Sequence, residues 1–305
     1  MTQWRNWSQS VIANPATFAR PRTLEELSTT LATARKARVM GAGHSFTPLC
    51  ATDDTLISLS ELEGAVDVSP DRATAWAPAG WSLARLTAAL WDEGLALINQ
   101  GDVNPQSLAG ASATGTHGTG AELGSISTQA VAYRVMLADG SMVECDAQNN
   151  PDLFQAQRLS LGLIGVAVAI KVAVLPAYHL EERIDLVPFA EMVERFDAIA
   201  ATSRHAEFFV FPYSDKVILK QLNPVPEEPG FRDENDMDEG AFKIACDICR
   251  AIPASVPMMQ RLMMRVVGKA KRRIGPAYRI FPQARALRFE EMEYEMPRAD
   301  GLAVL

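Results

Sequence analysis

Basic residues are in the minority in this 305-residue chain. It contains 29 lysines and arginines against 37 aspartates and glutamates, which gives a formal net charge of -8 at pH 7. A protein that neutralises nucleic-acid phosphates needs a basic surface, and no part of this chain has a domain-wide excess of cations. The charge balance argues against a nucleic-acid partner and favours small molecules.

Cysteine is also scarce. The four residues Cys50, Cys145, Cys246 and Cys249 are too few and too unevenly spread for a secreted domain held by disulfides, so we expect reduced thiols in a cytosol-like compartment. Cys246 and Cys249 form a C-x-x-C pair without a second ligand pair at a suitable spacing. We therefore expect two neighbouring helix thiols and predict no metal site.

Apolar runs long enough to cross a bilayer are absent. The strongest candidate, residues 161–176, is interrupted by Lys171 and is typical of a buried strand. The first ten residues, MTQWRNWSQS, lack the apolar core of a signal peptide. We expect a cytoplasmic protein without a transmembrane segment. Residues 258–275 combine methionines with cations, which leaves peripheral contact with a membrane open, although a helix packed on its own domain is the preferred interpretation.

Local signals predict helices and strands in the first half of the chain. Thr23 and Glu26 form a capping box ahead of a helical run, while Ser82 and Gly94 bracket a second helix. Residues 130–146 predict a hairpin with its turn at Asp139 and Gly140.

The second half has its own pattern. Residues 188–203 predict a helix, residues 206–222 predict strands, and the acidic stretch 224–240 predicts a mobile linker. The length favours two domains, which we place at residues 1–178 and 179–305.

Two stretches rich in small residues suggest a binding site. Residues 40–46, MGAGHSF, follow a short strand, and residues 99–120 contain five glycines among serines and threonines. Glycines let backbone amides approach a ligand, and hydroxyls replace the water that its oxygens lose. One Gly-x-Gly pair is common in ordinary turns, but two such loops predict a long phosphate-bearing ligand.

Two common nucleotide motifs are excluded. Gly43 is followed by His44 and, soon after, by Pro48, so no G-x-G-x-x-G opens a helix here. The P-loop pattern is also missing.

Residues 41–59, 99–120 and 160–170, in this order and spacing, resemble the vanillyl-alcohol-oxidase-type (PCMH-type) FAD flavoproteins. Within these the chain is most similar to the sugar-lactone oxidoreductases, the branch of L-gulono-1,4-lactone dehydrogenases and D-arabinono-1,4-lactone oxidases, which residues 207–216 and 291–301 also resemble. The resemblance implies an α+β fold: a two-subdomain FAD-binding domain, then an incomplete α+β substrate (cap) domain.

The resemblance also implies the cofactor site. His44 occupies the position of the histidine that is tethered through a ring nitrogen to the flavin 8α-methyl group, so covalent FAD is expected. A neutral imidazole is a competent nucleophile near pH 7. The residues expected to bind the cofactor are Met40, Gly41, Ala42, Gly43, His44, Ser45, Phe46, Gly101, Asp102, Ser107, Gly110, Ala111, Ser112, Ala113, Thr114, Gly115, His117, Gly118, Gly162 and Val168.

The roles of three residues within 99–120 remain open between two interpretations each. Gly101 matches the position beside the flavin C4a–N5 edge that influences oxygen access, but glycine there does not separate oxidase from dehydrogenase. Asp102 is a weak catalytic candidate, and substrate contact and a loop carboxylate bound by backbone amides are equally good interpretations. His117 contacts the cofactor or is a hydrogen-bonded structural histidine.

The function implied is oxidation of a sugar lactone or polyol by hydride transfer to flavin N5, with oxygen, a quinone or a cytochrome as the electron acceptor. The family's substrate-side Glu, Arg, His and Lys lie beyond the residue that matches Leu305, so no other catalytic residue is predicted. The alternative is a catalytically incomplete flavin-binding fragment, or a subunit that needs a second polypeptide.

Overall fold

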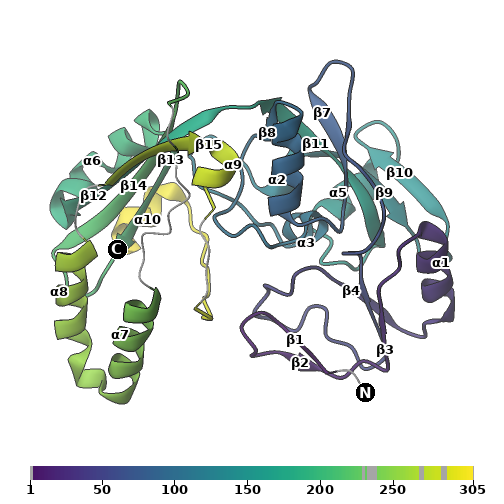
Figure 1. Ribbon diagram of the computed structural model, residues 1–305, viewed down its shortest axis with the longest axis horizontal. Helices are drawn as coiled ribbons and strands as arrows, with labels where there is room; N and C mark the ends of the chain where they lie inside the picture. Colours follow the sequence, from purple (N-terminus) through teal and green to yellow (C-terminus); the bar gives the residue numbers. More distant parts are fainter. Residues whose placement is uncertain (1–2, 229–230, 232–238, 268–270, 283–286, 305) are drawn as a thin grey trace. The chain divides into compact units, whose positions relative to one another are not determined.

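A computed structural model describes residues 3–228, 231, 239–267, 271–282 and 287–304 (Figure 1). The chain divides into two compact units. Unit 1 comprises Met1–Gly118, Leu123–Tyr178 and Ala277–Gln283, and unit 2 comprises Thr119–Glu122, His179–Pro276 and Ala284–Leu305. Helices and sheets occur in both units, which confirms the predicted α+β class.

The first part of unit 1 is a small parallel sheet in the order β3-β5-β4. Thr23 caps the helix that follows β3, because its hydroxyl accepts a hydrogen bond from the Glu26 amide at 3.2 Å, and the predicted helix start is confirmed. A short hairpin of β1 and β2 precedes the sheet. The elements are β1 (Trp4–Arg5), β2 (Ile12–Ala13), β3 (Thr17–Ala19), α1 (Leu24–Thr33), β4 (Ala37–Met40) and β5 (Thr55–Ser58).

The second part of unit 1 is a larger antiparallel sheet in the order β10-β9-β11-β7-β6, with β8 also paired to β11. Leucines of α2 and the inward residues of β9 and β11 form its core. The strands are β6 (Asp67–Val68), β7 (Thr74–Pro78), β8 (Leu95–Leu97), β9 (Ala130–Met136), β10 (Met142–Asp146) and β11 (Val166–Pro176). The helices are α2 (Leu83–Asp92), α3 (Leu108–Ala113), α4 (Ile126–Gln129), α5 (Pro151–Arg158) and α9 (Ala277–Ile280).

Several local predictions in this sheet are confirmed. Ser82 caps α2 by accepting from the Arg85 amide at 3.1 Å, and Gly94 lies just past the helix at φ +70°. Gly140 adopts φ +81° in the turn between β9 and β10, a left-handed conformation that suits glycine.

Two features differ from expectation. The sequence predicted no helix within residues 99–120, yet α3 forms there, because Leu108 and Ala111 are buried in the core. The buried strand predicted from residue 161 begins only at Val166, since Leu161 and Gly162 both adopt positive φ.

Unit 2 is built on one antiparallel sheet in the order β13-β14-β12-β15. The predicted helix α6 packs its apolar side on this sheet, with Met192 and Ile199 against Val217 and Leu219. The elements are β12 (His179–Pro188), α6 (Phe189–Thr202), β13 (His205–Val210), β14 (Lys216–Val225), α7 (Glu239–Ala251), η1 (Pro253–Ser255), α8 (Val256–Val267), β15 (Lys271–Pro276) and α10 (Arg298–Val304).

The helix predicted over residues 258–275 ends earlier than expected. The helix α8 stops at Val267, and Lys271–Pro276 form the edge strand β15 because they pair with β12. The predicted linker at 224–240 lies mostly outside the described residues. Cys246 and Cys249 are free thiols on α7, as expected.

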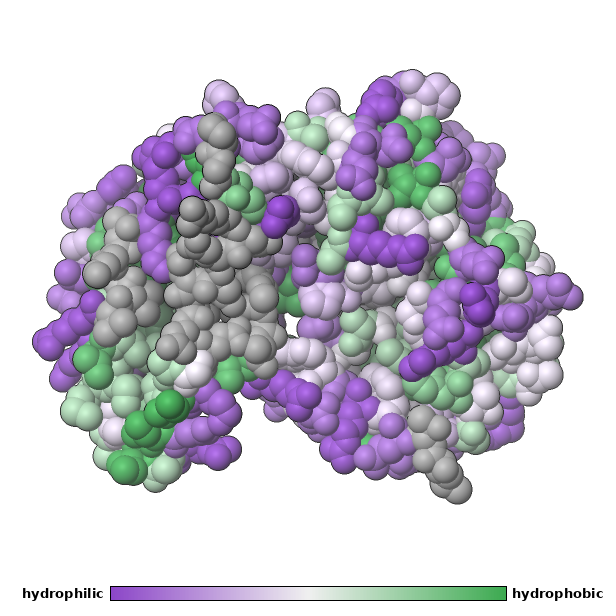
Figure 2. Space-filling view, viewed as in Figure 1, coloured by the Kyte–Doolittle hydropathy of each residue, from purple (hydrophilic) through white to green (hydrophobic). Residues whose placement is uncertain are grey.

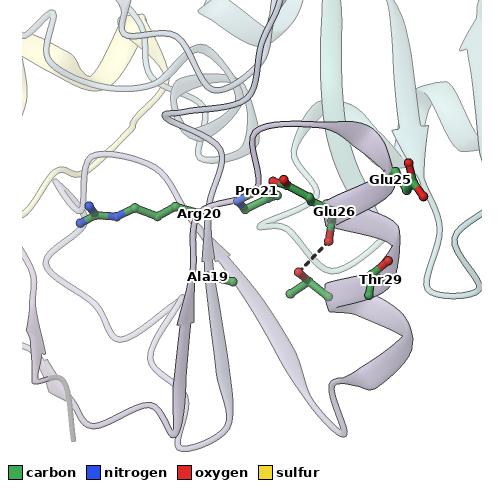
Figure 3. A pocket seen from close by; sticks show the side chains of 7 residues that line it. Ala19, Arg20, Pro21, Glu25, Glu26 and Thr29 are labelled. Carbon is green, nitrogen blue, oxygen red and sulfur yellow. Dashed lines mark hydrogen bonds between the residues drawn. The ribbon is translucent and has the colours of Figure 1, made fainter.

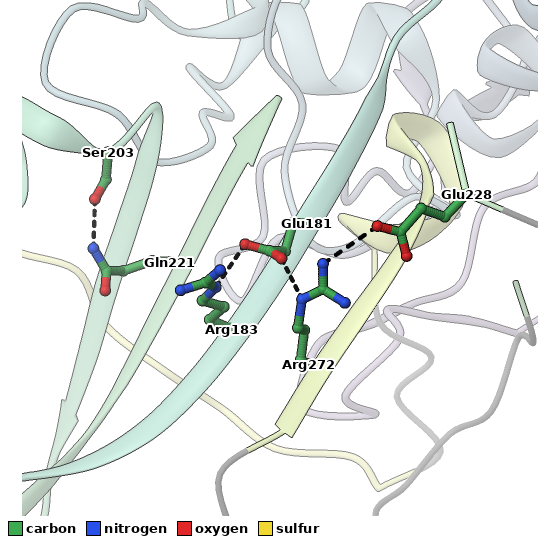
Figure 4. A network of polar contacts seen from close by, with 6 residues as sticks. All are labelled: Glu181, Arg183, Ser203, Gln221, Glu228 and Arg272. Carbon is green, nitrogen blue, oxygen red and sulfur yellow. Dashed lines mark hydrogen bonds and ion pairs between the residues drawn. The ribbon is translucent and has the colours of Figure 1, made fainter. Parts of the chain in front are cut away.

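Ion pairs cross the unit 2 sheet. The Glu181 carboxylate accepts a hydrogen bond from Arg183 at 2.6 Å and another from Arg272 (Figure 4). These hydrogen bonds, above all the one from Arg183, hold the pKa of Glu181 below its usual range. Lys220 is only 3% exposed and lies 2.8 Å from the Glu207 carboxylate. A buried ammonium group needs such a partner, because burying an unpaired charge costs several kcal/mol.

The burial of His205 predicts that the stability of unit 2 depends on pH. It is 1% exposed, and its Nδ1 donates to the Thr119 carbonyl oxygen at 3.0 Å. Burial lowers its pKa to about 4, the cations Arg204 and Lys220 act in the same direction, and the bond to Thr119 opposes them.

We expect unit 2 to lose stability between pH 7 and pH 5. The unfolded histidine has a pKa of about 6.5, so below pH 6.5 the unfolded state binds a proton that the folded state does not bind. The free energy of unfolding therefore falls by about 2 kcal/mol at pH 5. All five tryptophans lie in unit 1, so hydrogen exchange of β13 peptides, corrected for intrinsic rates, is the suitable measurement. A His205→Asn variant should show a flatter pH profile, and an unchanged slope in that variant would contradict the assignment.

Candidate functional site

The first glycine loop, residues 40–46, leaves the parallel sheet at the end of β4. Gly43 has φ +71°, and a Cβ there would lie 3.2 Å from a Trp4 ring carbon. The Trp7 amide donates to the Gly43 carbonyl oxygen at 2.7 Å, and Asn6 Nδ2 donates to the Ser45 carbonyl oxygen at 3.0 Å. The N-terminal hairpin therefore determines the shape of this loop, and sequence reasoning singled out neither Asn6 nor Trp7.

The second glycine loop, residues 99–118, contains α3. Ser107 caps α3 by accepting from the Gly110 amide at 3.1 Å. A Cβ added to Gly41 would overlap Ser107 Oγ and would lie 3.6 Å from Gly110 Cα. The structure thus brings the two glycine loops into contact. A side chain at position 41 would require the Ser107 hydroxyl, which caps α3, to move.

The ends of the second glycine loop also touch each other. A Cβ on Gly118 would overlap the Gln100 carbonyl oxygen, and one on Gly101 would lie 3.2 Å from the His117 carbonyl oxygen. Packing against neighbouring backbone is therefore one reason for glycine at position 101.

A buried carboxamide holds the start of the second glycine loop. Gln129 Oε1 accepts from the Ile98 and Asn99 amides at 3.1 and 3.3 Å, and its Nε2 donates to the Asn99 carbonyl oxygen at 2.8 Å. The sequence analysis missed Gln129, because a glutamine 30 residues along the chain gives no local signal.

His44 lies with its ring against Trp7. The ring centroids are 5.0 Å apart and the planes differ by 24°, which is a stacked arrangement. Burial lowers the pKa of the His44 imidazole below its ordinary value, so the neutral form dominates at pH 7. Neither ring nitrogen of His44 is hydrogen-bonded to a residue that the structure describes, which leaves a nucleophilic lone pair available.

The groups around both glycine loops fit FAD. The close glycine backbones present amides suited to a pyrophosphate. Within the described residues, the buried Oε1 of Gln106 receives no hydrogen bond, while its Nε2 lies 3.4 Å from Thr116 Oγ1. Beside the end of α3, where the Leu161 amide donates to the Ala113 carbonyl oxygen, an exposed apolar surface suits a flat ring. Its side chains are Leu159, Leu161, Leu163 and Ile164.

Some predicted cofactor residues point elsewhere. The side chains of Ala111, Ser112 and Val168 are buried, and Ser112 Oγ lies 2.7 Å from the Tyr133 hydroxyl. Any contact of these three residues with a ligand would therefore come through their backbone. Gly162 is exposed at φ +70°.

The remaining predicted residues are accessible from solvent to different degrees. His117 is exposed, and its Nδ1 donates to the Gly118 carbonyl oxygen at 2.8 Å. The partly buried members are Met40, Gly41, Gly43, Ser45, Phe46, Asp102, Gly110, Ala113 and Gly115, whereas Ala42 and Thr114 are exposed.

A hollow at the start of α1, lined by Arg20, Glu25 and Glu26 among others, contains none of the predicted residues (Figure 3). Across the described part of the chain, no three His, Cys, Asp or Glu side chains are grouped to hold a metal ion. No helix among the described residues is long and apolar enough to cross a membrane.

Comparison with solved structures defines the class. The fold matches cholesterol oxidase from Brevibacterium sterolicum with a TM-score of 0.77 at 18% identity, over 94% of this chain and 62% of that chain. Residues 15–146 match the family model of an FAD binding domain. The chain therefore has a PCMH-type fold, and residues 15–146 belong to an FAD binding domain.

Sequence relatives define the family. Residues 170–305 match the D-arabinono-1,4-lactone oxidase family model. An L-gulono-1,4-lactone dehydrogenase of Mycobacterium tuberculosis is 33% identical over 99% of this chain and 72% of its own length. Mouse L-gulonolactone oxidase is 32% identical, but the chain spans only 52% of it. The chain belongs to the family of FAD-dependent aldonolactone oxidases and dehydrogenases, and the resemblance predicted from its motifs is confirmed.

We expect Gly41→Ala to weaken FAD binding by at least about tenfold, or roughly 1.4 kcal/mol, because the new Cβ pushes Ser107 and α3 away. The double variant that also carries Ser107→Ala should recover part of the affinity. It lacks the Ser107 hydroxyl, so the nearest atom to the new Cβ at position 41 is the Cβ of residue 107, at 3.4 Å. Titration of apoprotein with FAD measures both variants, with Ser107→Ala alone as the control. Wild-type affinity in Gly41→Ala would rule out this arrangement of the two loops.

Proposed function

We propose that the protein is an FAD-dependent aldonolactone oxidoreductase that binds FAD along both glycine loops and carries it on His44. The observation that supports this most strongly is the close packing of Gly41 on the Ser107 side chain, beside a neutral histidine on the same loop. We assign residues 1–178 to the FAD-binding domain and residues 179–305 to the substrate domain, and the compact units and family matches support this division.

The backbone of the two glycine loops would hold the cofactor. Amides of Gly41 and Gly43 and the hydroxyl of Ser45 would bind its oxygens, in place of water. When bound, FAD supplies a hydride acceptor at its N5 atom for a CH–OH carbon. The preformed loops lower the entropy cost of binding, because hydrogen bonds from Asn6 and Gln129 already hold their backbones.

His44 would act as the nucleophile for cofactor attachment. A neutral ring nitrogen would form the C–N bond to the 8α carbon of FAD. One methyl proton and the imidazole proton would pass to solvent, and the two electrons released would go to an acceptor such as dioxygen. Its lowered pKa supports this role, since a protonated imidazole has no free lone pair.

The substrate proposed is a sugar lactone of the L-gulono-1,4-lactone or D-arabinono-1,4-lactone type, with a polyol as the alternative. The names of the relatives support the lactone. Asp102, partly buried beside Gly101, is the proposed contact for a substrate hydroxyl. Oxygen, a quinone or a cytochrome would take the electrons. Gly101 does not distinguish these acceptors, because its packing against the His117 carbonyl oxygen also favours glycine at this position.

We also propose a cytoplasmic location, where the four free thiols remain reduced. Peripheral contact with a membrane is the alternative. It is supported by an exposed apolar surface on the α7–α8 hairpin, visible at the lower left of Figure 2. Its side chains are Ile244, Ile248, Ile252, Met258 and Leu262.

Covalent attachment predicts flavin that survives denaturation. Acid precipitation of the wild-type holoprotein should leave the yellow colour in the pellet, whereas His44→Ala should release all of its FAD into the supernatant. His44→Ala should still bind FAD reversibly, because most contacts come from backbone amides. Complete release of flavin from fully loaded wild-type protein would show that attachment at His44 is wrong.

Lactone oxidation predicts reduction of the bound flavin. Anaerobic mixing of holoprotein with L-gulono-1,4-lactone or D-arabinono-1,4-lactone should bleach the flavin absorbance, and adding oxygen or a dye identifies the acceptor. Asp102→Asn should slow bleaching by about tenfold and leave FAD content unchanged, because one charge-assisted hydrogen bond to the substrate is lost. A flavin that dithionite reduces but no lactone or polyol does would contradict the proposed activity.

A further inference from the structure

The turn between β1 and β2 is a rigid piece of unit 1. Asn6 is 1% exposed. Its side-chain Oδ1 accepts a hydrogen bond from the Val11 backbone amide at 3.0 Å, and its backbone amide donates to the Val11 carbonyl oxygen at 3.1 Å. Trp4 and Ala13 on the two strands pack with Leu56 of β5 in one apolar cluster. The hairpin is therefore fastened to the parallel sheet at its base and closed by hydrogen bonds at its turn.

This hairpin meets the first glycine loop at four points. The Trp4 ring lies under Gly43, the Trp7 amide binds the Gly43 carbonyl oxygen, and Asn6 Nδ2 binds the Ser45 carbonyl oxygen. The fourth point is the stack of the Trp7 indole on the His44 imidazole. The first three contacts constrain the backbone on each side of His44, and the fourth constrains the side chain itself.

The stack matters because of how histidine rings are usually oriented. A reactive imidazole is commonly held by a hydrogen bond from one nitrogen to a carbonyl or carboxylate. Neither His44 nitrogen makes such a bond within the described part of the chain, and the χ2 torsion of histidine is soft. Packing on the flat Trp7 face can fix the ring plane without a hydrogen bond to either nitrogen.

We propose that Trp7 is a positioning residue for flavin attachment: its indole face holds the His44 imidazole in the orientation from which a ring nitrogen bonds to the flavin. This inference rests on the covalent link proposed above. Attack by a nitrogen on a carbon needs a defined approach, so a ring free to rotate reacts more slowly although its chemistry is unchanged. Burial of His44 keeps it neutral as well, and Trp7 covers one of its faces.

The test follows covalent attachment over time after apoprotein is mixed with FAD. Trp7→Ala should slow attachment by at least about tenfold while reversible FAD affinity stays within about threefold of wild type. Trp7→Phe keeps an aromatic face and should recover most of the rate. The matched control is Trp76→Ala, since Trp76 contacts Arg134 on the larger sheet of unit 1.

A second measurement does not depend on flavin. In the apoprotein, the ring current of Trp7 should move the NMR signals of the His44 ring protons upfield. This upfield shift of the His44 signals should vanish in Trp7→Ala, persist in part in Trp7→Phe and remain in Trp76→Ala. A His44→Gln variant identifies the signals among the four histidines.

The two measurements separate the outcomes. Wild-type attachment rates in Trp7→Ala, or unmoved His44 signals, would overturn the role of Trp7. If the wild-type protein attaches no flavin, the covalent link itself is wrong, and the His44 signals then decide whether Trp7 orients the ring. Equal slowing in Trp7→Phe and Trp7→Ala would also count against the stack, because an aromatic face would be present without effect.

Discussion

The site depends on one close approach, where Gly41 at the end of β4 packs on the Ser107 side chain at the start of α3. Any side chain at residue 41 would enter space that the Ser107 hydroxyl occupies. The contact joins the parallel sheet to the larger antiparallel sheet within unit 1, so a loop from each sheet contributes to one surface. Without it, the two glycine loops would be separate turns with no shared ligand.

Buried amide side chains keep this approach in place. Gln129 binds the backbone of residues 98 and 99, and Asn6 binds that of residues 11 and 45. A buried carboxamide without partners is costly, so each of these side chains favours the one loop conformation that satisfies it. The backbone amides of the two loops are consequently held in place by the protein itself, which is what phosphate recognition by main-chain groups needs.

Charge is used differently in the two units. The candidate site in unit 1 relies on neutral groups, and burial favours the uncharged form of His44. The sheet of unit 2 instead buries paired ions, such as Lys220 beside Glu207, and a histidine that burial keeps neutral. Removing one member of such a pair leaves the other uncompensated.

The sequence by itself determined the features that depend on neighbours along the chain. The caps at Thr23 and Ser82, the turn at Gly140 and the glycine loop around His44 were readable, because each involves residues within a few positions of one another. Only the tertiary structure decided which distant groups meet: Trp7 on His44, Ser107 on Gly41, His117 on Gly101, and residues 271–276 as a strand beside β12. These depend on packing between segments far apart in sequence, and no local propensity encodes that contact.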